Sequence, residues 1–80
     1  MNLQIITPDN TVFDGEVKLI QVPGSKGSFQ VLKNHAPIIS TLEKGEVKII
    51  DKNDRNSSFA IGGGVIEVKH NDIIILAEST

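Results

Sequence analysis

The sequence predicts an all-β protein in which roughly eight to ten short strands form two packed sheets. Ile, Val and Thr crowd the chain, and their β-branched side chains fit the pleated surface of a strand better than a helix. Turn-forming residues recur about every ten positions, a spacing typical of antiparallel sandwiches and barrels. The one segment with helical spacing, residues 38–44, is stopped at Gly45. We therefore expect strands along the whole chain.

Alternation and an intervening turn indicate the first two strands. Residues 2–7 alternate with the two-residue period of a half-buried strand. Pro8-Asp9-Asn10 is a turn signal, because proline pre-sets φ and Asx side chains bond their own backbone. A long strand follows over residues 11–22, and Asp14-Gly15 interrupts it. An isolated glycine in a strand predicts a bulge or a corner at that point.

The most distinctive stretch is residues 22–45, where turn residues bracket a short apolar strand. Pro23-Gly24 opens it, Gly27 follows, and the strand covers residues 29–32. His35-Ala36-Pro37 then breaks the chain again. Glycine takes positive φ without steric cost, whereas proline fixes φ and removes a hydrogen-bond donor. We therefore predict a strand–loop–strand unit with a shaped surface loop, and any specialised function should lie here.

The rest of the chain predicts four further strands, at residues 46–49, 57–61, 65–69 and 73–76. The polar run from Asp51 to Asn56 is a hairpin loop, and His70-Asn71-Asp72 is a tight turn. Gly62-Gly63-Gly64 could approach a ligand closely, but we favour a sheet corner where another strand crosses. The last strand is continuously apolar, which places it in the middle of the core.

Length and composition bound the class of protein. The 80 residues make a single domain, residues 1–80. The absence of cysteine excludes disulfides and thiolate metal sites. The net charge is −2 with both signs scattered, so we expect no nucleic-acid partner. The sequence has neither a signal-peptide pattern nor an apolar run of spanning length, so we expect no direct membrane insertion, and membrane association must come through a partner.

Candidate catalytic residues lack the spacing that chemistry requires. His35 and His70 lie in separate turns and form no H-x-x-x-H or H-E-x-x-H pattern. Ser28, Ser40 and Asp51 could complete a nucleophile set on paper, but there is no G-x-S-x-G elbow. The glycine loop that ends at Ser28 also differs from a phosphate-binding loop, because a strand follows it instead of a helix. We therefore predict no catalytic residue, metal site, cofactor or small-molecule ligand.

An alternative is a biotinyl or lipoyl carrier domain modified at Lys26. Carrier domains are β-sandwiches of this size with a modified lysine at a hairpin tip, and Lys26 lies at a turn between small residues. Their M-K-M or D-K-[AV] signature is missing, because Ser25 and Gly27 flank the lysine. This alternative stays open at the level of sequence, and an adduct would be visible in the intact mass.

Three groups of residues together match a family pattern. They are Phe13-x-Gly15-x-Val17 with Ile20-Gln21-Val22; Pro23-Gly24-x-x-Gly27 with Val31-Leu32-x-x-His35-Ala36-Pro37-Ile38-Ile39-x-Thr41-Leu42-x-x-Gly45; and Gly62-Gly63 with Glu67-Val68-x-x-Asn71-x-Ile73-x-Ile75-Leu76-Ala77-Glu78. In this order they resemble the epsilon subunit of the F-type ATP synthase over nearly the whole chain. Gln30 and Lys33 depart from the family pattern, which usually has glycine and proline there.

The resemblance implies a ten-stranded antiparallel β-sandwich of two packed sheets. It also implies a non-catalytic central-stalk (rotor) subunit of a proton-translocating F-type ATP synthase. Such a subunit couples the gamma subunit to the c-ring so that ion-driven rotation powers ATP synthesis, and it lies peripherally at the cytoplasmic face of the bacterial inner membrane. Most bacterial members continue into a two-helix domain, whereas this sequence stops at Thr80, so we expect no C-terminal helical hairpin.

The resemblance further assigns contact residues. The loop that faces the c-ring would consist of Ser25, Lys26, Gly27, Ser28 and Phe29. The residues that face gamma would be Thr7, His35, Ala36, Pro37 and Thr41. The residues themselves add one surface, because the strand face that carries Ile20 and Val22 becomes apolar toward its end, and we expect a partner to cover it.

Overall fold

The computed structural model describes residues 1–78, which form eight strands and no helix. The strands are β1 (Asn2–Ile6), β2 (Thr11–Val22), β3 (Phe29–Leu32), β4 (Ile38–Leu42), β5 (Gly45–Asp51), β6 (Asn56–Ile61), β7 (Gly64–Lys69) and β8 (Asp72–Ala77). The all-β prediction is confirmed, but the count of ten strands is wrong for this range. β2 has 12 residues and pairs with strands of both sheets. It is one continuous strand, but it would be counted twice if the strands of each sheet were counted separately.

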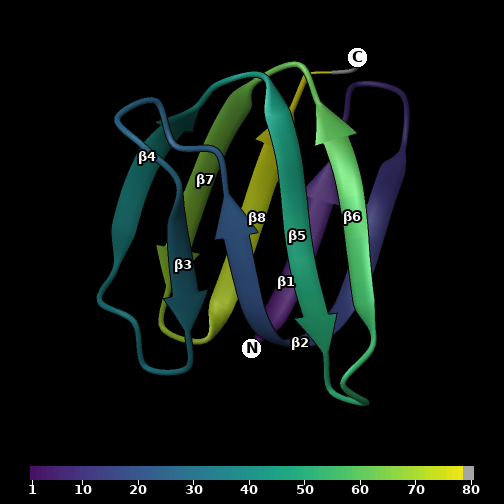
Figure 1. Ribbon diagram of the computed structural model, residues 1–80, viewed down its shortest axis with the longest axis vertical. Helices are drawn as coiled ribbons and strands as arrows, with labels where there is room; N and C mark the ends of the chain where they lie inside the picture. The colour runs from purple at the N-terminus through teal and green to yellow at the C-terminus, as the bar shows by residue number, and fades with distance from the viewer. Residues whose placement is uncertain (79–80) are drawn as a thin grey trace.

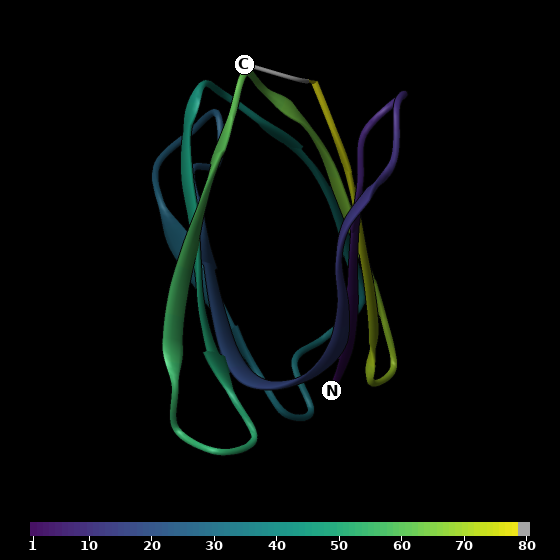
Figure 2. The same ribbon diagram turned by 90° about the vertical axis from the view of Figure 1, so that its right-hand side faces the viewer.

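The strands form two layers (Figure 1). The back sheet has the order β4-β7-β8-β1 and is completed by the first half of β2. The front sheet consists of β3, the second half of β2, β5 and β6. Figure 2 shows the layers from the side, with β2 curving from one to the other. The two-sheet sandwich predicted from the sequence is therefore present.

One strand pair departs from the predicted antiparallel pattern. β1 and β8 run parallel, with Leu3 beside Ile73 and Ile5 beside Ile75. All four side chains are buried, so this register aligns the inward faces of the first and last strands. The two ends of the chain thus meet in the middle of the back sheet, and the description of the sheets as fully antiparallel is wrong at this pair.

The predicted interruption of the long strand lies at a different position. Gly15 pairs regularly with Leu3, whereas the register of β2 against β5 shifts between Val17 and Leu19. This bulge changes which alternate residues face inward, so Ile20 and Val22 point into the core as β2 enters the front sheet. The expectation that a partner covers the Ile20–Val22 face is wrong, because the back sheet already covers it.

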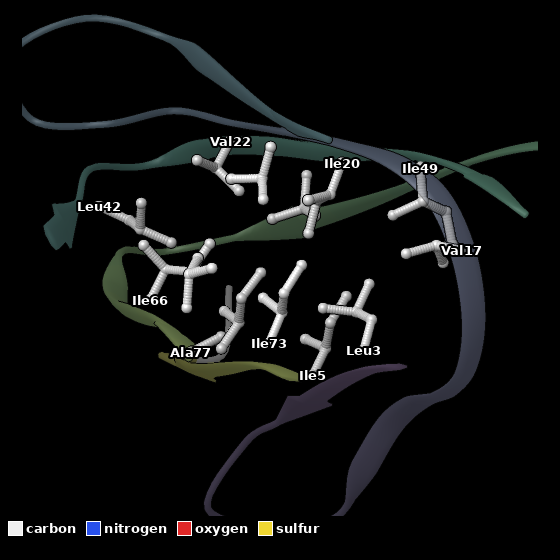
Figure 3. Close-up of a cluster of buried hydrophobic side chains, with 14 of the residues drawn as sticks. Leu3, Ile5, Val17, Ile20, Val22, Leu42, Ile49, Ile66, Ile73 and Ala77 are labelled. Atoms are coloured by element: carbon white, nitrogen blue, oxygen red, sulfur yellow. The ribbon is translucent and has the colours of Figure 1, made fainter. Parts of the chain in front are cut away.

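The core lies between the sheets and is entirely apolar among the described residues. Figure 3 shows inward side chains of both sheets meeting there, including Leu3 and Ile5 of β1 and Ile20 and Val22 of β2. No polar or charged side chain in residues 1–78 is buried. Interiors packed in this way have low compressibility and transmit strain, so the sandwich is a stiff body.

The glycine run ends one strand and begins the next. Gly62 donates its N–H to the Glu78 carbonyl at 3.0 Å, and Glu78 donates to the Gly63 carbonyl at 2.9 Å. Gly63 and Gly64 have φ of 130° and 152°, values that side chains rarely allow. The corner predicted for this run is present, and the end of β8 crosses it.

Candidate functional site

The loop between β2 and β3 is tied to the edge strand β4. β2 and β3 form a hairpin that closes with Val22 opposite Phe29. Beyond this pair, Ser25 donates its backbone N–H to the Thr41 carbonyl at 3.1 Å, and Glu43 donates to the Pro23 carbonyl at 2.9 Å. The shaped loop predicted from the sequence is therefore held on the body of the sandwich instead of projecting freely.

The two glycines of the loop serve different purposes. Gly24 is buried, and a Cβ on it would lie 2.6 Å from the Gly27 carbonyl oxygen and 2.8 Å from the Phe29 ring. Gly24 is thus required for close packing. Gly27 has open space around it but a φ of 125°, so it is required for backbone conformation. A hydrogen bond of 2.9 Å from the Gly27 N–H to the Gly24 carbonyl closes the turn.

A groove of about 610 Å³ runs between this loop and β4. Its walls are residues 24–29 and 38–41, so it contains the whole loop assigned to the c-ring. Thr41 also lies here, because its Oγ1 donates to the Ser25 Oγ at 2.9 Å. The structure therefore places Thr41, which was assigned to the gamma-facing residues, beside the loop assigned to the c-ring. Ile39 is 71% exposed on the same strand.

His35, Ala36 and Pro37 lie at the opposite end of β4, in the turn after β3. The His35 N–H bonds the Leu32 carbonyl at 3.1 Å, and the His35 ring lies with Nδ1 2.7 Å from the Ala36 carbonyl oxygen. A carbonyl only accepts, so Nδ1 is the donor in this contact. His70 shares a recess of about 280 Å³ with this turn. Sequence reasoning missed this proximity because it depends on the pairing of β4 with β7.

Thr7 lies apart from the other assigned residues. Its Oγ1 donates to the Asn10 carbonyl at 3.1 Å and lies 3.3 Å from the Asn10 N–H, so the hydroxyl holds the turn between β1 and β2. β1 and β4 run in the same direction within the back sheet. β4 is antiparallel to β7, β7 is antiparallel to β8, and β8 is parallel to β1. Thr7 and Thr41 therefore lie at one end of that sheet and the His35 turn lies at the other, and the three form no single cluster.

The outer face of the back sheet carries an apolar row at one end, and sequence reasoning did not identify it as a surface. Thr41, Val65, Leu76 and Ile6 stand opposite one another in a row across β4, β7, β8 and β1. Leu76 is 56% exposed and Val65 is 39% exposed. We call the side chains Ile6, Val65, Ile74 and Leu76 the back-sheet patch, and Glu67 of β7 separates Ile74 from Ile39 on this face. The available signal was the apolar run in β8, which has isoleucine or leucine at both alternating positions.

The charged groups show no catalytic arrangement within residues 1–78. Asp51 accepts hydrogen bonds from the N–H groups of Asn53 at 2.8 Å and Arg55 at 3.0 Å, in the turn between β5 and β6. The bond from the Arg55 backbone is the main cause that lowers the pKa of the Asp51 carboxyl, and burial opposes it. Asp51 is thus committed to its turn and does not join Ser28 and Ser40. No group of three or more His, Asp or Glu side chains in the described part could hold a metal ion.

Comparison with known proteins identifies the family. The model of the ATP synthase Delta/Epsilon chain beta-sandwich domain matches residues 1–80. The chain belongs to this family. The ATP synthase epsilon chain of Chlorobaculum tepidum is 41% identical over 76 residues, which cover 95% of this chain and 86% of that protein. The epsilon chain of Leptospira borgpetersenii is 40% identical over 78 residues, which cover 98% of this chain but 61% of the relative.

Two solved structures share the fold at lower identity. A chain of the Euglena gracilis mitochondrial ATP synthase has a TM-score of 0.88 at 21% identity, covering 94% of this chain and 48% of that one. A chain of the Tetrahymena thermophila mitochondrial ATP synthase central stalk and c-ring has a TM-score of 0.82 at 23% identity, covering 99% and 63%. This epsilon-type sandwich thus spans about half to two-thirds of the structural relatives.

The family assignment decides between the readings left open by the sequence. The ATP synthase epsilon chain is a non-catalytic subunit of its complex, so no reaction is assigned to this domain. Lys26 does lie at the tip of the β2–β3 hairpin, as a carrier domain requires. However, the tip is hydrogen-bonded to β4, and the family model that matches is that of the Delta/Epsilon chain. The family assignment therefore favours the epsilon-type domain over the carrier domain.

Proposed function

We propose that this domain is a non-catalytic central-stalk (rotor) subunit of a proton-translocating F-type ATP synthase. It joins the gamma subunit to the c-ring, so that ion-driven rotation powers ATP synthesis. It is held peripherally at the cytoplasmic face of the bacterial inner membrane by these two partners. The observation that carries the proposal is the attachment of the glycine loop to β4, which makes a surface loop part of a stiff body.

A coupling subunit must transmit torque without yielding. The apolar core between two hydrogen-bonded sheets supplies stiffness, because close-packed interiors resist deformation. The loop adds a rigid contact, since two backbone hydrogen bonds and one hydroxyl pair hold it on β4. A pre-organised loop loses little conformational entropy when it binds. These features support a contact that is fixed before assembly.

The gamma subunit binds the back-sheet patch in this proposal. The patch is a group of apolar side chains bordered by Gln4 and Glu67, an apolar centre with a polar rim that is typical of interfaces. Thr41 and Ile6 end the cross-strand row, Thr7 follows Ile6, and the His35 turn lies at the other end of β4. The residues assigned to gamma thus surround this face. A stable interface shared by two partners needs about 1,000 Å² in total, which a sheet face together with an edge groove can supply.

The c-ring binds the edge formed by the loop Ser25–Phe29. This edge lies beside the patch, because Ile39 and Thr41 belong to both the groove and β4. One continuous border can therefore contact a partner on the sheet face and another partner at the loop. The separation of the two contacts allows each to be tested alone.

A pair of leucine substitutions tests the gamma contact. Leu76→Arg places a charge in the back-sheet patch, whereas Leu32→Arg places the same charge on the front sheet, and the two leucines are 56% and 52% exposed. With the gamma subunit of the same organism, Leu76→Arg should weaken binding at least about tenfold, because burying a charge against an apolar partner surface is costly. Leu32→Arg should bind as wild type. Equal binding of both variants would refute the assignment.

A cysteine pair tests the c-ring contact in the assembled rotor. Ser28→Cys should form a disulfide with a cysteine placed in the polar loop of the c-ring under mild oxidation. Asn53→Cys is the matched control, because it lies exposed in the turn between β5 and β6. Absence of the Ser28 crosslink in a complex that retains gamma would show that the loop faces elsewhere.

A further inference from the structure

We propose that the groove beside Lys26 receives a turn of the c-ring that presents a carboxylate next to an apolar side chain. The inference rests on the proposed function and names the chemistry of the partner at this edge. Three properties of the groove carry it: an unpaired cation, available hydroxyl donors and an exposed apolar wall.

The cation is Lys26, which is the one charged residue among those that line the groove. Within residues 1–78 the ion pairs join the Met1 amino group to Glu16 and Lys18 to Asp54, and neither involves Lys26. The chain as a whole carries a net charge of −2, so a lone positive charge on the contact loop opposes the overall sign. Electrostatic complementarity therefore favours an anionic group on the partner.

Two hydroxyls beside Lys26 supply hydrogen-bond donors. Thr41 uses its O–H to bond the Ser25 Oγ at 2.9 Å, which leaves the Ser25 O–H available to donate to another acceptor. Ser28 lines the same groove with an exposed hydroxyl. Serine hydroxyls and an ammonium group together match a carboxylate, which accepts through both oxygens. A guanidinium or ammonium group on the partner would instead meet like charge.

The β4 wall of the groove presents the exposed apolar side chain of Ile39. Ile39 is 71% exposed on β4, and the Phe29 ring packs partly against the core at the base of the loop. An isolated carboxylate would leave this wall in water. The occupant that satisfies both walls is a turn that places an acidic residue beside an aliphatic one.

The test measures binding of the gamma-bound domain to detergent-solubilised c-ring from the same organism. Lys26→Gln should weaken binding about two- to fivefold at low salt, the scale of one exposed ion pair. Lys26→Glu should weaken it about tenfold or more, because like charges then face each other. Raising the salt to about 0.5 M should make the affinities of wild type and the two Lys26 variants nearly equal, because the electrostatic screening length shortens. Lys52→Glu is the control, because it makes the same change of net charge on the exposed turn after β5.

The outcomes separate this inference from the proposed function. If wild type binds the c-ring and Lys26→Glu binds equally well or more tightly, the carboxylate assignment is overturned while the c-ring contact stands. If wild type, with gamma bound, does not bind the c-ring at any salt, both proposals are overturned. Restoration of Lys26→Glu binding by an acidic-to-lysine change in the c-ring loop is the confirming result.

Discussion

Replacing Gly27 by valine should damage assembly far more than folding. The residue has a φ of 125°, and no atom outside its chain neighbours lies within 4 Å of the position a Cβ would take. The new side chain therefore meets no steric obstacle in the body of the protein. It does oppose the backbone conformation, because a β-branched residue at this φ costs about 1–3 kcal/mol.

The loop can avoid most of this strain by opening. The bond that closes the turn runs from the Gly27 N–H to the Gly24 carbonyl at 2.9 Å, and its loss costs about 0.5–1.5 kcal/mol. The core side chains are in other elements and keep their contacts. For a domain of this size, each 1 kcal/mol of lost stability lowers the melting temperature by roughly 4–8 °C. The contact surface, by contrast, loses its fixed shape.

Two measurements on the same protein test this reasoning. Urea unfolding should show a loss of no more than about 1.5 kcal/mol with an unchanged slope, because the loop contributes little buried surface. Crosslinking through Ser28→Cys in the assembled rotor should fall strongly. Gly24→Ala is the matched comparison, since its Cβ would strike backbone at 2.6 Å and should cost about 1–3 kcal/mol through overpacking. A large unfolding loss for Gly27→Val with normal crosslinking would refute the argument.

Two further predictions concern stability. Ile75→Ala should cost about 2–5 kcal/mol in urea unfolding, because Ile75 is fully buried between β7 and β1, and a loss below about 1 kcal/mol would mean that the core collapses around the site. Asp51→Asn should destabilise the domain at neutral pH. The folded pKa of Asp51 is lowered from 3.8, so its contribution is present above that pH and is lost as the pH falls through the lowered pKa. A difference from wild type that persisted under strongly acidic conditions would contradict this assignment.

The sequence predicted local structure well and long-range arrangement poorly. The hairpin loop after Asp51 and the turn at His70 were correct, because polar and turn-forming residues act within a few positions of the chain. The parallel pairing of β1 with β8 was missed, since it joins residues about 70 positions apart and leaves no local mark. The contact of Thr41 with Ser25 was missed for the same reason.

The displaced bulge in β2 has a related cause. A glycine marks where a bulge is tolerated, but the bend is needed where the strand leaves one sheet for the other. That point is set by the packing of both sheets around Val17 and Ile20, which both face the core although their alternation differs. Alternation alone therefore assigned the Ile20–Val22 face to the outside. In a two-layer fold, inward and outward faces are defined only once the opposite sheet is known.

The apolar run of β8 leads from the sequence to the assembly. A continuous apolar strand predicts burial on both faces, which is typical of a sheet covered on each side. In the sandwich the inner face of β8 is covered, with Ile73 and Ile75 buried, but Leu76 is 56% exposed on the outer face. Two layers therefore satisfy half of what the sequence predicts, and a partner bound to the outer face would satisfy the other half. The back-sheet patch is where we place the gamma subunit, so a gamma complex in which Leu76 stays in contact with water would refute that placement even if the two proteins bind.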